Sequence, residues 1–122
     1  AAYRAIGNKR LVVVTDSAPS AGLPEGEYVM GGARVVVRDG AVFLPDGTLT
    51  GGSISLFEAM MNLARFCSIP LEEAIPCATA NPAKLIGAYD EVGSLEVGKL
   101  ADFIVLDKDN NIKQIFVGGV GL

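Results

Sequence analysis

The carboxylate of Asp16 stands where this sequence is best placed to do chemistry. It follows Thr15 and the apolar run of residues 11–14, a pattern typical of a strand buried on both faces in a parallel sheet. Enzymes built on closed parallel sheets gather reacting groups at the carboxyl ends of their strands, where a partly desolvated carboxylate can exchange protons near neutral pH. The alternative is structural, because Asp often accepts hydrogen bonds from the amides of the following turn. Both a proton-transfer group and a turn cap fit this position.

A second candidate segment is formed by Leu49, Thr50 and Gly51, ahead of a predicted helix. Glycine lets a ligand approach the main chain closely, and the free amides at a helix start favour anionic or polar groups. Most glycine pairs mark turns instead, so the pair Gly51 and Gly52 is also explained by a hinge into the helix.

Other residue types limit what these 122 residues can do alone. Histidine is absent, which rules out a Ser-His-Asp triad, a Cys-His pair and a zinc site of three or four ligands from this chain. Ser17 and Ser20 therefore lack a general base and are not predicted as nucleophiles. Cys67 and Cys77 give neither a zinc motif nor a disulfide framework, and we predict buried thiols in a reducing cytoplasm.

Composition excludes several kinds of partner. Ten Lys and Arg against 14 Asp and Glu give a net charge of −4, and Lys9 with Arg10 is the longest basic cluster. No nucleic acid is expected, because its binding needs a basic face. No membrane is expected either, since the uncharged apolar runs are far too short to span a bilayer.

The first half predicts a loop, a ribbon and a helix. Residues 17–26 are rich in turn formers and predict a loop of about ten residues. Asp39 and Gly40 between residues 28–37 and residues 41–44 are typical of a β-hairpin, with a strand break or bulge at Gly31 and Gly32. The next helix is expected to begin with a capping box between Ser55 and Glu58 and to run for about four turns. One face of that helix would carry Leu56, Met60, Leu63 and Cys67.

The second half predicts short helices followed by strands. Residues 71–80 are helical in pattern, and Pro76 is expected to kink or divide the helix. A third helix is expected to start with Asn81 as its cap and to end at Gly87. Residues 102–107 and 112–117 then read as two strands around a polar turn. Lys99 and Asp102 are expected to share the turn that leads into them.

This order of elements predicts part of a larger α/β architecture. Only residues 11–14 read as a parallel strand, and such a strand needs neighbours to pair its amides, so the missing strands must lie upstream or in another chain. An eight-stranded barrel takes about 250 residues. We therefore expect the last strand and helices of a (β/α)8 barrel in residues 1–89, with part of a small β-sandwich in residues 90–122.

A resemblance follows from several segments in unbroken order. They are Val13-Val-Thr-Asp-Ser-Ala-Pro-Ser-Ala-Gly22, Gly26-Glu-Tyr, Val37-Arg-Asp-Gly40, Asp46-Gly-Thr-Leu-Thr-Gly-Gly-Ser53, Asn81-Pro-Ala83 and Gly93-Ser-Leu-Glu-Val-Gly-Lys-Leu-Ala-Asp-Phe-Ile-Val-Leu106. Together they resemble the carboxyl-terminal third of the N-acetylglucosamine-6-phosphate deacetylases, in the amidohydrolase superfamily. The last segment recurs across many amidohydrolases, so the deacetylase resemblance depends on residues 13–53.

The resemblance implies a fold, a reaction and roles for residues. It implies the barrel and a sandwich built from both chain termini, in a cytoplasmic enzyme that is usually a homodimer. Asp16 would move the proton in the hydrolysis of N-acetylglucosamine 6-phosphate to glucosamine 6-phosphate and acetate. Leu49, Thr50 and Gly51 would contact this amino-sugar phosphate. A divalent metal ion, with zinc favoured, would be held by residues upstream of this chain, so the isolated segment is predicted to be inactive.

Two other interpretations remain open at this point. The first is another amidohydrolase, dihydroorotase-like or deaminase-like, which acts on a cyclic amide or amine. The second is a non-catalytic assembly module, for which the absence of histidine is the best support.

Overall fold

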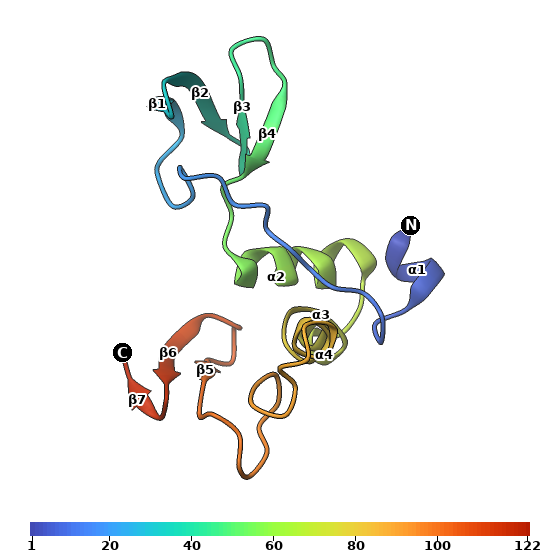
Figure 1. Cartoon of the computed structure of the whole chain (residues 1–122). Helices are drawn as coiled ribbons and strands as arrows, with labels where there is room; N and C mark the ends of the chain where they lie inside the picture. The colour runs from blue at the N-terminus through green and yellow to red at the C-terminus, as the bar shows by residue number, and fades with distance from the viewer. The chain divides into compact units, whose positions relative to one another are not determined.

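Four helices and seven strands make up the chain, with the strands in two separate antiparallel sheets (Figure 1). The computed structural model describes all of residues 1–122. By their internal contacts the residues divide into two units. One is Val12–Ala74, and the other combines Ala1–Leu11 with Ile75–Leu122. The architecture is thus α/β, as predicted.

The unit Val12–Ala74 contains a four-stranded sheet in the order β1-β2-β3-β4. Its strands are β1 (Gly26–Met30), β2 (Ala33–Arg38), β3 (Ala41–Phe43) and β4 (Leu49–Gly52). The hairpin turn at Asp39 and Gly40 is confirmed, with φ of 50° and 73° at the two residues. Gly31 and Gly32 also have positive φ and form a second two-residue turn, so the strand break predicted there is a full hairpin.

The core of this sheet is built from valines on β2 and β3. Val35, Val37 and Val42 are buried, and four partly buried residues pack against them. These are Ala18, Tyr28, Met30 and Leu44. Alternate residues of β2 face this core because side chains alternate along a strand. The loop residue Ala18 therefore packs against the same core as the strands.

Helix α2 (Leu56–Cys67) follows β4 and begins with the predicted capping box. The Ser55 hydroxyl accepts from the Glu58 amide at 3.1 Å, and the Glu58 carboxylate accepts from the Ser55 amide at 2.8 Å. The ionised carboxylate is stabilised by this amide, which lowers the pKa of Glu58 below its ordinary 4.5. Met60 is the buried residue of the helix, as expected for its apolar face.

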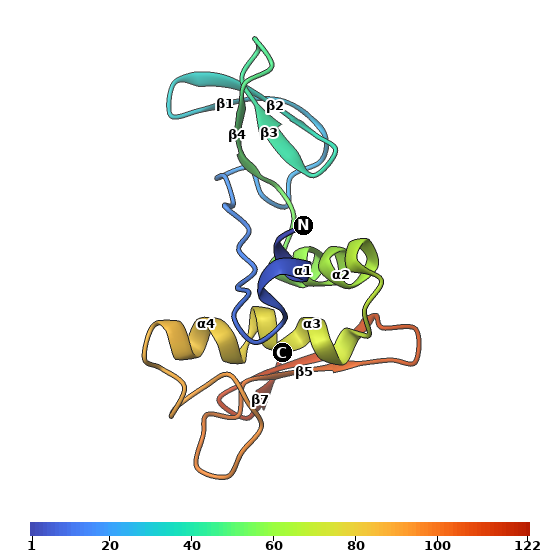
Figure 2. The same ribbon diagram turned by 90° about the vertical axis from the view of Figure 1, so that its right-hand side faces the viewer.

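Helices α3 (Leu71–Ala78) and α4 (Ala80–Leu85) follow one another along nearly one line (Figure 2). The helix continues through Pro76, and the break falls at Thr79 instead. The prediction of Asn81 as a helix cap is wrong, because α4 begins at Ala80 with Thr79 as its N-cap and Asn81 lies inside the helix. The predicted end at Gly87 is confirmed, since Gly87 and Ala88 donate to the carbonyls of Lys84 and Ala83 in a Schellman motif.

The buried amide of Asn81 anchors the start of the chain, which includes α1 (Ala2–Ile6). Its Nδ2 donates to the carbonyl oxygens of Asn8 at 2.6 Å and of Leu11 at 2.7 Å. The thiol of buried Cys77 also donates to the Asn8 carbonyl, at 3.5 Å. Cys77 is a buried thiol outside any disulfide, as predicted, whereas Cys67 also forms no disulfide and is partly exposed.

The second sheet has the order β5-β6-β7, formed by β5 (Phe103–Leu106), β6 (Ile112–Val117) and β7 (Val120–Gly121). The two predicted strands are confirmed, and the rings of Phe103 and Phe116 stack with centroids 4.4 Å apart. Asp107 organises the turn between them by accepting from the amides of Asp109 and Asn111. These bonds favour the ionised carboxylate and lower the pKa of Asp107 below 3.8.

Lys99 and Asp102 do not share a turn as predicted. The Lys99 ammonium donates to the Tyr89 carbonyl and the Ser94 hydroxyl, and it lies 3.5 Å from the centroid of the Tyr89 ring. Asp102 instead accepts from the Gly118 amide at 2.6 Å, between β6 and β7. Lys99 thus binds the segment from Tyr89 to Ser94, whereas Asp102 binds the turn between β6 and β7.

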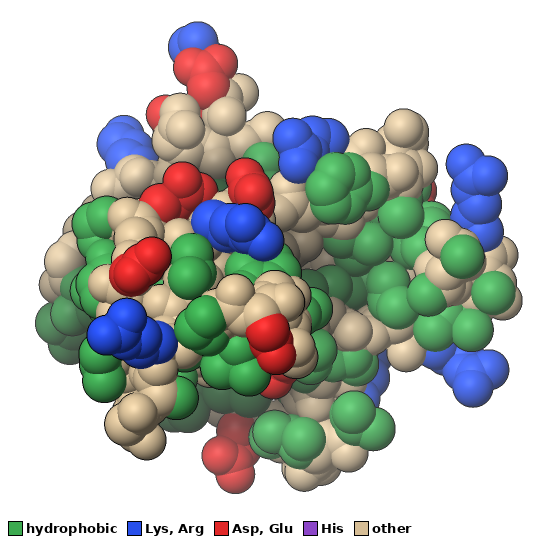
Figure 3. Space-filling view, turned by 90° about the horizontal axis from the view of Figure 1, so that it is seen from above, with side chains coloured by type: hydrophobic (Ala, Val, Ile, Leu, Met, Phe, Trp, Pro, Cys, Tyr) green, Lys and Arg blue, Asp and Glu red, His purple; other side chains and the backbone are tan.

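The prediction of a buried strand over residues 11–14 is not confirmed. These residues pair with no other strand, and Val14 is 75% exposed. The physical reason is that no other segment here supplies the parallel neighbours such a strand needs. Many large apolar side chains are exposed in the same way, as the space-filling view shows (Figure 3). No helix is both long and apolar enough to cross a bilayer.

Candidate functional site

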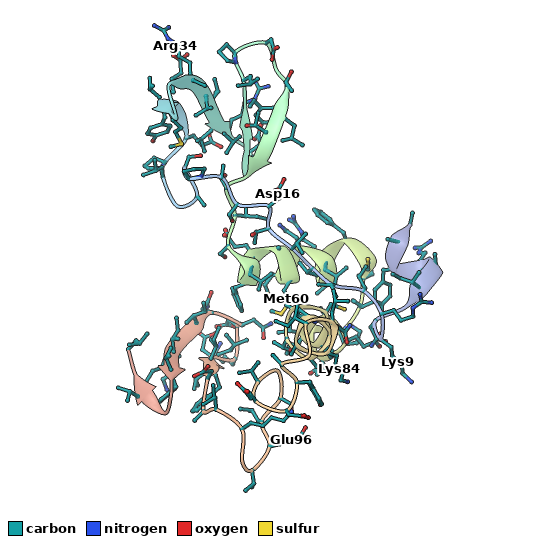
Figure 4. The ribbon with its side chains drawn as sticks, viewed as in Figure 1. Lys9, Asp16, Arg34, Met60, Lys84 and Glu96 are labelled. Atoms are coloured by element: carbon teal, nitrogen blue, oxygen red, sulfur yellow. The ribbon has the colours of Figure 1, made fainter.

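Asp16 is exposed and lies at the base of the four-stranded sheet, in the unit Val12–Ala74 (Figure 4). Its carboxylate has no hydrogen-bond or ion-pair partner within the chain. The side chain therefore does not cap the following turn, which was the structural alternative. The residues of this chain also do not bury it, in contrast to the expected partial desolvation. The carboxylate is therefore free to meet a ligand or solvent.

The backbone of Asp16 takes an uncommon conformation. Its φ is 49°, in the left-handed region that Asp tolerates better than most residues. Such residues cost about 1–3 kcal/mol each and persist where the surrounding structure holds them. The neighbouring strand provides that support.

Strand β4 pairs with the backbone on both sides of Ser17, directly after Asp16. The amide of Gly52 donates to the Asp16 carbonyl at 2.8 Å, and the Ala18 amide donates to the Gly52 carbonyl at 2.9 Å. Ser17 and Gly52 form an isolated parallel bridge. The structure thus brings two of the sequence candidates together, namely Asp16 and the strand that carries Leu49, Thr50 and Gly51.

The glycines of β4 are explained by this close approach of two backbones. A Cβ added to Gly51 would lie 2.9 Å from the Asp16 carbonyl oxygen and 3.3 Å from the Ala18 Cβ. A Cβ added to Gly52 would overlap the Thr15 carbonyl oxygen. Neither glycine has a positive φ, so close packing rather than a hinge accounts for them.

Leu49 and Thr50 lie on a β-bulge at the edge of the sheet. The register pairs Val42 with Gly51 but Phe43 with Leu49, which leaves Thr50 as the extra residue. The Thr50 hydroxyl donates to the Val42 carbonyl at 3.0 Å, and the Leu49 side chain is 63% exposed. Bulges are over-represented at sheet edges and beside active sites. Sequence reasoning missed this bulge, because only the register of β3 against β4 reveals it.

The loop that follows Asp16 is folded against the sheet. Glu25 Oε1 accepts from the Asp39 amide and the Tyr28 hydroxyl donates to the Pro24 carbonyl, both at 2.8 Å. Ser20 is fully buried, and its hydroxyl has no partner that would activate it as a nucleophile. Both ends of the loop are therefore tied to strands, which restricts the movement of Asp16.

The residues present do not fit a metal centre. No three His, Cys, Asp or Glu side chains come together anywhere in the chain. The carboxylates with clearly lowered pKa values, among them Asp46 and Glu96, bind amides, hydroxyls or Lys99 within their own turns. Any metal at this site must be held by residues other than these.

The model of the Amidohydrolase family matches residues 2–121. The chain belongs to the amidohydrolase family. Members are generally metal-dependent. Over 118 residues this amidohydrolase is 33% identical to the N-acetylglucosamine-6-phosphate deacetylase of Vibrio furnissii, covering 97% of this chain and 29% of the relative. An N-acetylgalactosamine-6-phosphate deacetylase of Escherichia coli O157:H7 is 33% identical over 111 residues, covering 91% of this chain and 29% of the relative.

Solved structures of the same enzymes share the fold of this amidohydrolase. N-acetylglucosamine-6-phosphate deacetylase from Pasteurella multocida matches with a TM-score of 0.87 and 35% identity, over 98% of this chain and 31% of that one. The enzyme from Thermotoga maritima matches with a TM-score of 0.86 and 31% identity, over 98% and 32%. The chain therefore spans about a third or less of the length of these relatives.

Proposed function

We propose that this chain is the carboxyl-terminal part of an enzyme that hydrolyses N-acetylglucosamine 6-phosphate to glucosamine 6-phosphate and acetate. The observation that carries the proposal is the match to deacetylases over 97% of the chain, with Asp16 and the Gly51 strand side by side. In this proposal residues 1–89 belong to a (β/α)8 barrel and residues 90–122 to a β-sandwich. The complete enzyme is a cytoplasmic homodimer.

The proposed chemistry assigns proton transfer to Asp16. Its carboxylate accepts a proton from the attacking water as the new C–O bond forms. It then donates that proton to the amide nitrogen, so that the C–N bond breaks and a neutral amine leaves with acetic acid, which releases its proton to solvent to give acetate. The free, exposed carboxylate suits this role, because no internal partner competes for it. A divalent ion, with zinc favoured, would be bound by residues outside this chain, and the residues here supply none of its ligands.

The main chain of β4 is proposed to hold the substrate. The bulge at Thr50 and the exposed side chain of Leu49 leave this edge accessible to the sugar phosphate, and Gly51 continues the same main chain next to Asp16.

Asp16→Asn in the complete gene product tests the catalytic assignment. Asparagine is nearly the same size but cannot shuttle a proton, so turnover of N-acetylglucosamine 6-phosphate should fall at least about a hundredfold. Metal content by elemental analysis should stay unchanged, because no residue of this chain is proposed as a metal ligand. Near-normal turnover would remove Asp16 from the mechanism.

A second candidate substrate is N-acetylgalactosamine 6-phosphate, favoured by the Escherichia coli relative that is named for it. The two sugars differ only in the configuration at one hydroxyl, so kcat/KM for both, measured side by side, decides between them. High turnover of a cyclic amide or amine with neither acetyl sugar would favour a dihydroorotase-like or deaminase-like enzyme. No turnover of any of these by the complete, metal-loaded gene product would favour a non-catalytic module.

A further inference from the structure

We propose that Gly51 and the backbone of Gly52 are positioning residues that aim the Asp16 carboxylate. The inference rests on the proposed function, since it concerns how the same site is held. Gly51 would then act through Asp16 in addition to any contact it makes with substrate.

Only the backbone determines where the Asp16 side chain points. Its side chain makes no hydrogen bond or ion pair within the chain. The backbone in turn is held in the left-handed region, with φ of 49°, a conformation that persists only where neighbours fix it. Loss of those neighbours would let Asp16 relax to an ordinary conformation and swing its carboxylate away.

Strand β4 supplies those neighbours. The Gly52 amide donates to the Asp16 carbonyl, and the Gly52 carbonyl accepts from Ala18, so the two bonds hold the turn on either side of Ser17. These bonds require the two backbones to lie in contact. Gly51 is buried in that contact, facing the Asp16 carbonyl oxygen and the Ala18 side chain.

A side chain at Gly51 would clash with the Asp16 backbone. A methyl group on Gly51 would sit 2.9 Å from the Asp16 carbonyl oxygen, closer than carbon and oxygen tolerate, and the oxygen belongs to backbone that cannot rotate aside. The Asp16 turn must therefore move. Because a misplacement of about 1 Å costs about a hundredfold in rate, a shift of a few tenths of an ångström should cost about tenfold.

The test is Gly51→Ala in the complete gene product, measured alone and together with Asp16→Asn. Gly51→Ala should lower kcat about tenfold or more. In the Asp16→Asn background the same change should lower kcat less than twofold further, because no proton-transfer group is left to misplace. Ala21→Ser is the control, since Ala21 is exposed in the same loop and its φ is not positive, and it should change kcat less than twofold.

The outcomes separate the two proposals. Normal turnover of Asp16→Asn overturns the proposed function of Asp16. A large loss in Asp16→Asn combined with normal kcat in Gly51→Ala overturns the positioning role alone. If the two losses multiply in the double variant, the positioning role is also overturned, because Gly51 would then act by substrate contact. If Gly51→Ala does not fold, Ala18→Pro takes its place in the same cycle, since it removes one N–H donor to Gly52 and leaves β4 intact.

Discussion

Replacing Asn81 with alanine should release the first eleven residues of the chain from α4. The Asn81 side chain is only 8% exposed, and both hydrogens of its Nδ2 are used, one on the Asn8 carbonyl and one on the Leu11 carbonyl. Alanine keeps the helix and removes both donors. The segment lost in this way is the one that leads directly toward Asp16.

The expected magnitude follows from these two bonds. Each contributes about 0.5–1.5 kcal/mol net, and a buried carbonyl left without a donor costs more. The Asn8 carbonyl keeps the weak Cys77 thiol donor, whereas the structure gives the Leu11 carbonyl no other partner. The sum is about 2 kcal/mol, which corresponds to about a 30-fold increase in the local opening equilibrium of this segment.

Hydrogen exchange by mass spectrometry on the complete gene product measures this directly. Amides of residues 1–11 should exchange about 30-fold faster in Asn81→Ala than in the unaltered protein. Asn62→Ala is the matched control, because Asn62 lies on α2 and its amide oxygen accepts only from Arg65. It should leave residues 1–11 unchanged. Exchange within about threefold of normal in Asn81→Ala would refute the reasoning, since other contacts would then hold the segment.

Two further predictions concern carboxylates with lowered pKa values. Ser55→Ala removes the hydroxyl that caps α2, so it should destabilise the helix by about 1 kcal/mol by chemical denaturation and raise the pKa of Glu58, followed by NMR, part of the way to 4.5. An unchanged Glu58 pKa would contradict this. The pKa of Asp107 is held below 3.8, so its contribution to the β5-β6 hairpin should be complete above pH 3.8 and lost as pH falls through the lower folded value. Asp107→Asn should remove this acid dependence from the exchange rates of the hairpin amides.

Features that depend on neighbouring residues in sequence could be predicted. The turn at Asp39 and Gly40 needs two residues that tolerate positive φ, and the α2 cap needs a hydroxyl and a carboxylate three residues apart. The end of α4 needs a glycine in the left-handed region at Gly87. In each case the interactions that determine the structure lie within a few residues of chain, so the local sequence pattern is sufficient to predict it.

Features that depend on distant residues could not be predicted. Asn81 matched a helix cap by type, but its amide is taken by carbonyls some 70 residues earlier. Residues 11–14 have the pattern of a buried strand, yet a strand forms only where partners exist. The catalytic role of Asp16 stays a prediction, and its left-handed backbone and the bulge at Thr50 arise from pairing with β4 or within it. No local pattern carries that information.

The anchor between Asn8 and Asn81 also sets an order for events during synthesis. The two residues are 73 positions apart, so at about 5–20 residues per second the ribosome takes about 4–15 s to make the second after the first. The hairpins of β1 to β4 join residues close in sequence and form in microseconds once they emerge. The sheet beside Asp16 can therefore be complete on the nascent chain before Asn81 exists to bind residues 1–11, and a chaperone that shields those residues would act in that interval.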